Sequence, residues 1–159
     1  MGESSVATTF EPEAITEIAS GLTQALAETA VATMKAQNFH WNVKGMAFGP
    51  LHDLFQKIYE DHFVAQDDLA ERIRALGEHA EGRQSVYLSR SAIKEHDGHA
   101  SAEAMIAALV ADQETLSATL RALAAVAENH GDVVTNDMAI GRAQVHDKFA
   151  WLLRSHIEV

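Results

Sequence analysis

The sequence predicts an all-α protein, a four-helix bundle in which one long connection joins the second and third helices. Alanine is abundant and runs of β-branched residues are short, which favours helices over strands. Apolar residues recur at helical spacing through four segments, and the breaks between them contain glycine or proline. With 159 residues, 47% of them hydrophobic, the chain can form the core of one domain. We expect a flexible acidic tail over residues 1–10 and a single domain over residues 11–159.

The first two predicted helices form an antiparallel pair. The first runs from Pro12 to about Phe39, and a proline suits the first turn because its missing N–H would have no partner there. Residues 41–49 contain two glycines and no apolar periodicity, so we expect a short turn. Pro50 opens the second helix, whose apolar stripe keeps nearly a heptad spacing as far as Gly77.

The longest break in the helical pattern covers residues 80–100, and we expect one or two turns of helix inside it at 89–95. Ser101 is placed to cap a third helix, which stops near Gly131. Asp132 is placed to cap a fourth helix that continues almost to the end of the chain. A single long crossover between helices two and three is the ferritin-like arrangement of a four-helix bundle.

Composition excludes several classes of function. The chain has no cysteine, which excludes disulfides, thiolate zinc sites and cysteine nucleophiles. Its net charge is −11 and no lysine or arginine precedes Lys35, which argues against binding to DNA phosphates. No apolar run reaches the ~18 residues of a membrane span, and the first residues do not resemble a signal peptide. We therefore expect a cytoplasmic protein without membrane contact. Motifs for nucleotide binding, acyl transfer and helical zinc sites are also absent from the sequence.

Four side chains on the second predicted helix indicate a metal site: His52, Gln56, Asp67 and Glu71. At 100° per residue the last three lie about 40°, 60° and 100° around the helix from His52, so all four share one face. His52 and Asp67 are nevertheless about 22 Å apart along the helix, whereas a metal ligand lies about 2 Å from its ion. One helix cannot close such a site. A second, antiparallel copy related by a two-fold axis near residues 60–61 could close it twice per dimer.

His40 completes the predicted site, because it ends the first helix just across the turn from His52. Two imidazoles and two carboxylates suit Fe(II), Mn(II) or Zn(II) better than Ca²⁺. No glutamate is followed three residues later by a histidine, which argues against an iron site inside a single bundle. An Asp-x-x-x-Glu pair alone is usually a solvated helix face, so the set of spacings carries the hypothesis.

Several other residues have two interpretations each. His62 falls in the apolar stripe, where a packed core or interface histidine is the simpler interpretation and an accessory metal ligand the alternative. Trp41 and Tyr59 would lie near the site, either packing an interface or intercepting oxidising equivalents. Asp132 and Asp137 could line an acidic mouth, although helix capping accounts for Asp132 equally well.

Three segments resemble the Dps family of ferritin-like mini-ferritins. They are Phe-His-Trp-Asn-Val-Lys-Gly at 39–45, Leu-His-Asp at 51–53 and Asp-Asp-Leu-Ala-Glu-Arg-Ile at 67–73, and residues 147–155 are similar to the family's closing helix. The resemblance covers about residues 13–157. The first segment, with a second histidine 12 residues after its own, is highly specific.

The resemblance implies a hollow dodecameric shell with ferroxidase centres at its two-fold interfaces. Each centre would take His40 and His52 from one subunit and Asp67 and Glu71 from its mate, and could hold two irons. Fe(II) would be oxidised there, with hydrogen peroxide preferred over dioxygen, and ferric mineral would be stored inside. Such chemistry protects DNA from oxidative damage.

The resemblance further implies that Asp137, and less directly Asp132, lie at a three-fold pore through which iron enters. Two features depart from the family. Gln56 stands where a carboxylate is common, so we expect the second iron to bind weakly. The tail is acidic where DNA-condensing members carry lysine-rich termini, so we expect no appreciable DNA binding. The alternatives are a nucleoid-compacting protein with weak or lost ferroxidase activity and a structural or signalling shell without it.

Overall fold

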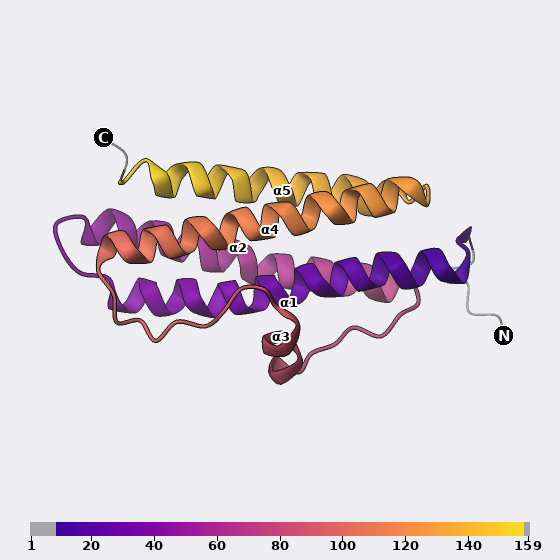
Figure 1. Ribbon diagram of the computed structural model, residues 1–159, viewed down its shortest axis with the longest axis horizontal. Coiled ribbons are helices and arrows are strands. Elements are labelled where there is room, and N and C mark those ends of the chain that lie inside the picture. The colour runs from indigo at the N-terminus through magenta and orange to yellow at the C-terminus, as the bar shows by residue number, and fades with distance from the viewer. Residues whose placement is uncertain (1–8, 158–159) are drawn as a thin grey trace.

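The structure is a computed structural model that describes residues 9–157, and its architecture is the predicted bundle (Figure 1). This part of the chain contains five helices and no strand, with the bounds α1 Pro12–Asn42, α2 Phe48–Ala75, α3 Gln84–Arg90, α4 Ala102–Asn129 and α5 Val133–Arg154. Helix α1 packs along α2, and α4 packs along α5. The connection from α2 to α4 runs along the outside of α1 and carries α3, which contacts α1 (Figure 1). The predicted all-α, ferritin-like class is confirmed.

The long helices begin and end close to their predicted limits. Pro12 opens α1, and the helix continues three residues beyond Phe39, where the N–H of Val43 closes the last turn on the Phe39 carbonyl at 2.9 Å. Helix α2 starts two residues before Pro50, and Gly77 follows its end with a φ of 90°, a conformation that glycine adopts without strain.

The short helix was predicted at 89–95, and that position is wrong: α3 spans Gln84–Arg90. Its start is fixed by Glu81, whose carboxylate accepts two backbone N–H bonds at 2.9 Å and whose carbonyl accepts the Tyr87 hydroxyl. Beyond α3 the chain is held in a non-helical conformation because Ile93 is buried against α1 and α4. Burial of that one side chain outweighs the helical propensity of the residues around it.

The core contains two large apolar clusters, a smaller one around Ile93 and Leu116, and a polar layer in the middle of the bundle. One large cluster lies around Leu22, Ile73 and Leu120, and the other around Phe39 and Phe55. Along the four long helices, the residues between these clusters include buried polar and charged side chains: Lys35, His62, Asp112, Gln113, Ser117 and His146. The middle of the bundle is therefore held together by hydrogen bonds and ion pairs as well as by apolar packing.

The ends of the described chain bear on three predictions. Phe10, assigned to the tail, packs against the first apolar cluster, and the division into a tail over residues 1–10 and a domain over residues 11–159 stays a prediction. Residues 1–8, on which the prediction of an acidic tail without DNA affinity rests, lie outside the described residues. Across residues 9–157 no helix combines the length and hydrophobicity needed to cross a bilayer.

Candidate metal centre

His40 and His52 face each other across the turn between α1 and α2. Their ring centroids are 3.7 Å apart with 17° between the ring planes. Nδ1 of His40 lies 2.8 Å from the carbonyl oxygen of His52, and Nδ1 of His52 lies 2.8 Å from the carbonyl oxygen of His40. A carbonyl oxygen only accepts hydrogen bonds, so each Nδ1 carries a proton and the nitrogen of each ring that can bind a metal is Nε2. A histidine whose outer nitrogen donates to a carbonyl in this way is oriented for binding a metal.

Aromatic side chains hold the stacked pair in place. Tyr59 contacts the His40 ring edge-on, with centroids 5.2 Å apart, and Phe48 stacks on His52 at 5.0 Å. His40 is buried and His52 half-buried. Trp41, next along α1, is 59% exposed. The pair therefore lies at the surface with its ring orientation fixed, beside aromatic side chains that remain open to a partner.

Gln56 lies one turn after His52 and is oriented by Glu60. Its Nε2 donates to Glu60 Oε1 at 2.7 Å, and the side chain is half-buried. An amide that directs its N–H₂ group at a carboxylate directs its carbonyl oxygen elsewhere. The geometry therefore leaves a neutral oxygen ligand on the predicted metal-binding face of α2.

Asp67 and Glu71 are exposed and lie further along α2, about 22 and 28 Å from His52 at 1.5 Å per residue. Over residues 9–157, no group of three or more His, Asp or Glu side chains converges to hold a metal ion within one subunit. The structure thus brings His40 and His52 together and leaves the two carboxylates apart from them. A metal that used all four ligands would need two subunits.

Large apolar side chains are exposed between the two ends of this face. Phe63 is 71% exposed and lies about 20° around α2 from His52 at 100° per residue. Val64 is 59% exposed, and Met34, on the neighbouring face of α1, is 51% exposed. Exposed side chains of this size and number are typical of surfaces that a partner covers.

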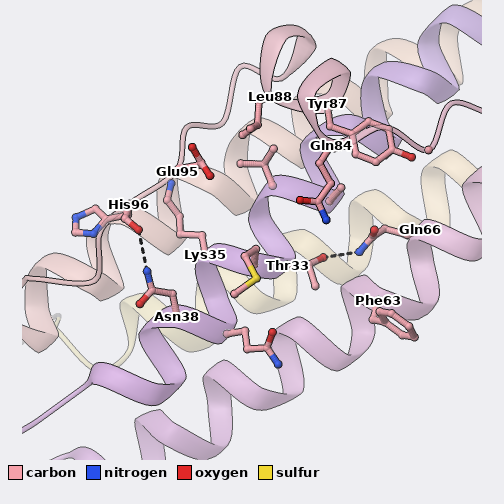
Figure 2. Close-up of a pocket in the computed structure, with 15 residues that line it drawn as sticks. Thr33, Lys35, Asn38, Phe63, Gln66, Gln84, Tyr87, Leu88, Glu95 and His96 are labelled. Carbon is pink, nitrogen blue, oxygen red and sulfur yellow. Dashed lines mark hydrogen bonds between the residues drawn. The ribbon is translucent and has the colours of Figure 1, made fainter.

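A cavity of about 560 Å³ lies beside Phe63, between α1, α2 and α3 (Figure 2). Two hydrogen bonds connect residues that line it: Gln66 donates to Thr33 and Asn38 donates to the carbonyl of His96, both at 2.8 Å. None of the predicted metal ligands lines this cavity. It therefore belongs to the exposed face and not to the histidine pair.

Two acidic residues predicted at a pore differ in their surroundings. Asp132 is 1% exposed, caps α5 by accepting the N–H of Thr135, and pairs with Arg72 at 2.8 Å. Burial alone would raise the pKa of Asp132, but hydrogen bonds from Thr135 and Arg72 outweigh it and hold that pKa below its usual value. The capping interpretation accounts for Asp132, whose carboxylate has no free face. Asp137 is exposed, and its pore role stays a prediction.

His62 is a packed core histidine. It is fully buried, and its two ring nitrogens lie 3.1 Å from Asp61 Oδ2 and 3.1 Å from Gln113 Nε2. Both nitrogens are occupied, so the ring offers nothing to a metal. Sequence analysis missed the surroundings of His62, namely its partner Gln113 and, on α5, His146 and Arg142, which hydrogen-bond to Gln113 and Asp61.

Comparisons with known proteins agree on one family. The model of the ferritin-like domain matches residues 19–159. The DNA protection during starvation protein 2 of Bacillus anthracis is 34% identical over 136 residues, covering 86% of this chain and 93% of that protein. The crystal structure of a Dps protein from Bacillus brevis has a TM-score of 0.90 at 30% identity, over 93% of this chain and 99% of that one. The Dps protein from Vibrio cholerae O1, described as a member of a broad superfamily of ferritin-like diiron-carboxylate proteins, has a TM-score of 0.91 at 26% identity, over 99% of each chain.

Proposed function

The chain belongs to the Dps family of ferritin-like proteins, and on that premise we propose that it oxidises Fe(II) at centres shared by two subunits and stores the ferric product inside a hollow dodecameric shell. Iron binding and ferroxidase-type activity belong to the ferritin-like diiron-carboxylate superfamily in general, and iron storage with DNA protection to its Dps members. The proposal adds to these the residues, the oxidant and the assembly.

One observation carries the proposal: the reciprocal hydrogen bonds of His40 and His52. Because each Nδ1–H donates to the other residue's carbonyl, the ring orientation of both histidines is fixed and Nε2 is the nitrogen left for a metal. A pair of histidines that served only to close the α1–α2 turn would need no free acceptor nitrogens at the surface. The arrangement is prepared to bind a divalent cation before the cation arrives.

The remaining ligands in this proposal come from a second copy of the chain. An antiparallel α2 places Asp67 of the partner subunit and Glu71 of the partner subunit beside the histidine pair. Two carboxylates balance the charge of Fe²⁺, which two neutral imidazoles cannot do. The exposed Phe63, Val64 and Met34 lie on the face that such a dimer covers, and this supports the assembly.

The proposed reaction takes one electron from each of two Fe(II) ions and gives both to hydrogen peroxide, which is reduced to water with uptake of two protons. Paired transfer avoids the hydroxyl radical that a single-electron step releases. Tyr59 in contact with His40, and Trp41 beside it, are placed to donate an electron when the second iron is absent. Gln56 is the weak ligand of the second iron position, and Asp137 lies on the route by which iron enters.

The test compares Glu71→Ala with the control Asp68→Ala, which removes an exposed carboxylate about 160° around α2 from His52, beyond the span of the predicted ligands. Apo-protein is loaded anaerobically with two Fe(II) per subunit, and ferric absorbance is followed after addition of peroxide and, separately, of air. We expect fast oxidation by peroxide in the wild type and the control, with about one peroxide consumed per two irons. We expect Glu71→Ala to react at least about 100-fold more slowly while it remains a shell by size-exclusion chromatography, since one lost metal interaction of 2.7 kcal/mol gives this factor.

Two outcomes would count against the proposal. If the wild-type protein oxidised iron no faster than buffer, the ferroxidase function would be rejected. The hypotheses of a structural shell and of a DNA-compacting protein would then have to be considered again. If Glu71→Ala and Asp68→Ala oxidised iron at equal rates, the ferroxidase activity would stand, but the assignment of its site to these residues would be wrong.

A further inference from the structure

Five side chains in the middle of the bundle form a closed ring of hydrogen bonds. The ring runs through α2, α4 and α5, and its members are Asp61, His62, Gln113, His146 and Arg142. The bonds from His62 to Asp61 and Gln113 measure 3.1 Å each, Gln113 Oε1 lies 2.7 Å from His146 Nδ1, and His146 Nε2 lies 3.2 Å from Arg142. Arg142 closes the ring on Asp61 with two bonds of 3.0 and 2.8 Å. His62, Gln113 and His146 are 0% exposed.

The hydrogen bonds of the ring can run in only one direction, because two of its members have fixed roles as donor and acceptor. Arg142 can only donate and the Asp61 carboxylate can only accept. His146 Nε2 must therefore accept from Arg142, which places the proton of His146 on Nδ1, where it donates to Gln113 Oε1. The amide of Gln113 then donates from Nε2 to His62 Nε2, and His62 donates from Nδ1 to Asp61. Every donor and acceptor in this sequence is used, and both imidazoles are neutral.

The ring has no place for a further proton. A proton on His62 Nε2 would face the N–H₂ group of Gln113, and a rotated amide would direct that group at the Nδ1–H of His146. His146 could yield only by moving its proton to Nε2, where Arg142 donates, and Arg142 is held by Asp61. Each local adjustment therefore transfers the conflict to the next member. One proton can be accommodated only when α2, α4 and α5 separate.

Electrostatics around the ring act in the same sense. Burial lowers the pKa of His62, although Asp61 raises it. Burial also lowers the pKa of His146, to about 2, and the neighbouring His62 and Arg142 lower it further. Burial would raise the pKa of Asp61, but the hydrogen bonds from His62 and Arg142 hold it well below its usual range.

The groups that bear on the ring come from all four long helices. On α4, Asp112 precedes Gln113 and pairs with Lys35 of α1 at 2.9 Å. On α5, Asp147 follows His146 and pairs with Arg121 of α4 at 2.6 Å. Burial raises the pKa of Asp112 to about 6 against the opposing effect of Lys35. Asp112 therefore takes up a proton in the folded state below about pH 6, which favours folding in acid and opposes the effect of the ring.

We propose that this ring is a proton-operated latch, which holds α2, α4 and α5 together while both imidazoles are neutral and releases them in acid. The inference does not depend on the ferroxidase site, since none of the ring members belongs to it. A histidine that resists protonation in the folded state but accepts a proton near pH 6.5 when unfolded stabilises the fold above that pH. This stability is lost as the pH falls below 6.5. With two such histidines, the unfolding equilibrium constant increases up to about 100-fold for each pH unit.

The experiment measures unfolding by denaturant at pH 7.5, 5.5 and 4.5 for the wild type and for a variant with an apolar ring, His62→Leu, Gln113→Met and His146→Leu together. This variant keeps Asp112 and its pair with Lys35, so the opposing contribution of Asp112 cancels in the comparison. We expect the ratio of the two unfolding constants, wild type over variant, to increase about 100-fold between pH 5.5 and 4.5. Equal pH dependence in the two proteins would overturn the proposal.

A second measurement needs no variant and applies even if the triple substitution prevents folding. Hydrogen–deuterium exchange at the imidazole C2 position, read by mass spectrometry on the assembled wild-type protein, reports the titration of each histidine. We expect His62 and His146, both fully buried, to show no inflection between pH 5 and 8. An inflection at either ring histidine within this pH range would show that the ring accepts protons without opening.

Discussion

Two pairs of histidines share this bundle and differ in what their nitrogens contact. At the surface, His40 and His52 each donate from Nδ1 to a backbone carbonyl and leave Nε2 free. In the middle, His62 and His146 have both nitrogens engaged by side chains. The residue type is the same in both pairs, and the second hydrogen bond decides whether a ring is available to a metal.

The kind of partner explains the difference. A carbonyl of the main chain cannot change direction or protonation state. It therefore fixes the proton on one ring nitrogen and leaves the other nitrogen without a required partner. Side-chain partners can rotate, so a single direction is obtained only when the ring of bonds closes on groups of fixed role, here Arg142 and Asp61. The surface pair is thus suited to binding, and the buried pair to holding helices together.

The largest effect that would test this contrast is the substitution His146→Ala. It leaves the Gln113 carbonyl without its donor, removes one of the two acceptor side chains of Arg142 and opens a cavity between buried helices. We expect the free energy of unfolding to fall by about 4 kcal/mol, the sum of an unsatisfied buried polar group and a cavity. Divalent metal binding, measured by Co(II) titration, should be unchanged. The control His99→Ala, at an exposed ring, should change the stability by less than about 0.5 kcal/mol.

A small loss of stability in His146→Ala would mean that the ring contributes little to the packing of α5. A loss of Co(II) binding in the same variant would mean that the two pairs are coupled through the bundle. Either result would break the division of roles between the two pairs.

The reverse experiment is His52→Ala, which removes a surface ligand. We expect Co(II) affinity to fall about 100-fold or more, because loss of even an outer partner of a metal ligand costs 10- to 100-fold. The free energy of unfolding should change by about 1 kcal/mol, the value of one hydrogen bond from a half-buried ring to a carbonyl. Titration calorimetry and chemical denaturation measure the two quantities, with the exposed His79→Ala as control. Unchanged affinity would mean that the stacked rings only close the α1–α2 turn.

The contrast also shows how far the sequence alone could lead. Helical periodicity placed His40 opposite His52 and put Asp67 and Glu71 on one face, because these positions follow from 100° per residue and one short turn. The reciprocal hydrogen bonds could not be predicted, since they depend on how the two helix ends approach each other. The capping interpretation of Asp132 was available from position, but its pairing with Arg72 was not.

The polar layer is the part that sequence patterns missed. His62 was identified as a core residue because it falls in the apolar stripe. Two residues that contact it, Gln113 and His146, lie 51 and 84 residues further along the chain, on helices whose rotation about their axes is set by packing, and both look like ordinary polar interruptions of an apolar pattern. The prediction of the position of α3 was wrong for a related reason, because burial of Ile93 is a tertiary contact. Local periodicity predicts faces, and only the packed bundle shows which faces meet.

The smallest expected effect concerns Gln56, the neutral ligand at the surface pair. Gln56→Glu adds a carboxylate where the amide oxygen now faces away from Glu60. We expect the second divalent ion to bind about 10-fold more tightly, which is 1.4 kcal/mol, while the first is nearly unchanged. The new charge lies one turn from Glu60, and this like-charge pair should lower the free energy of unfolding by about 0.3 kcal/mol. Calorimetric titration with Zn(II) measures both binding steps, and Gln144→Glu, the same change at an exposed site on α5, controls for net charge. If both variants tighten the second step equally, the shell's overall charge controls it and Gln56 has no part in the centre. If only Gln56→Glu does so, the amide is what limits the second iron, and the surface pair is a metal centre of which one position has been weakened.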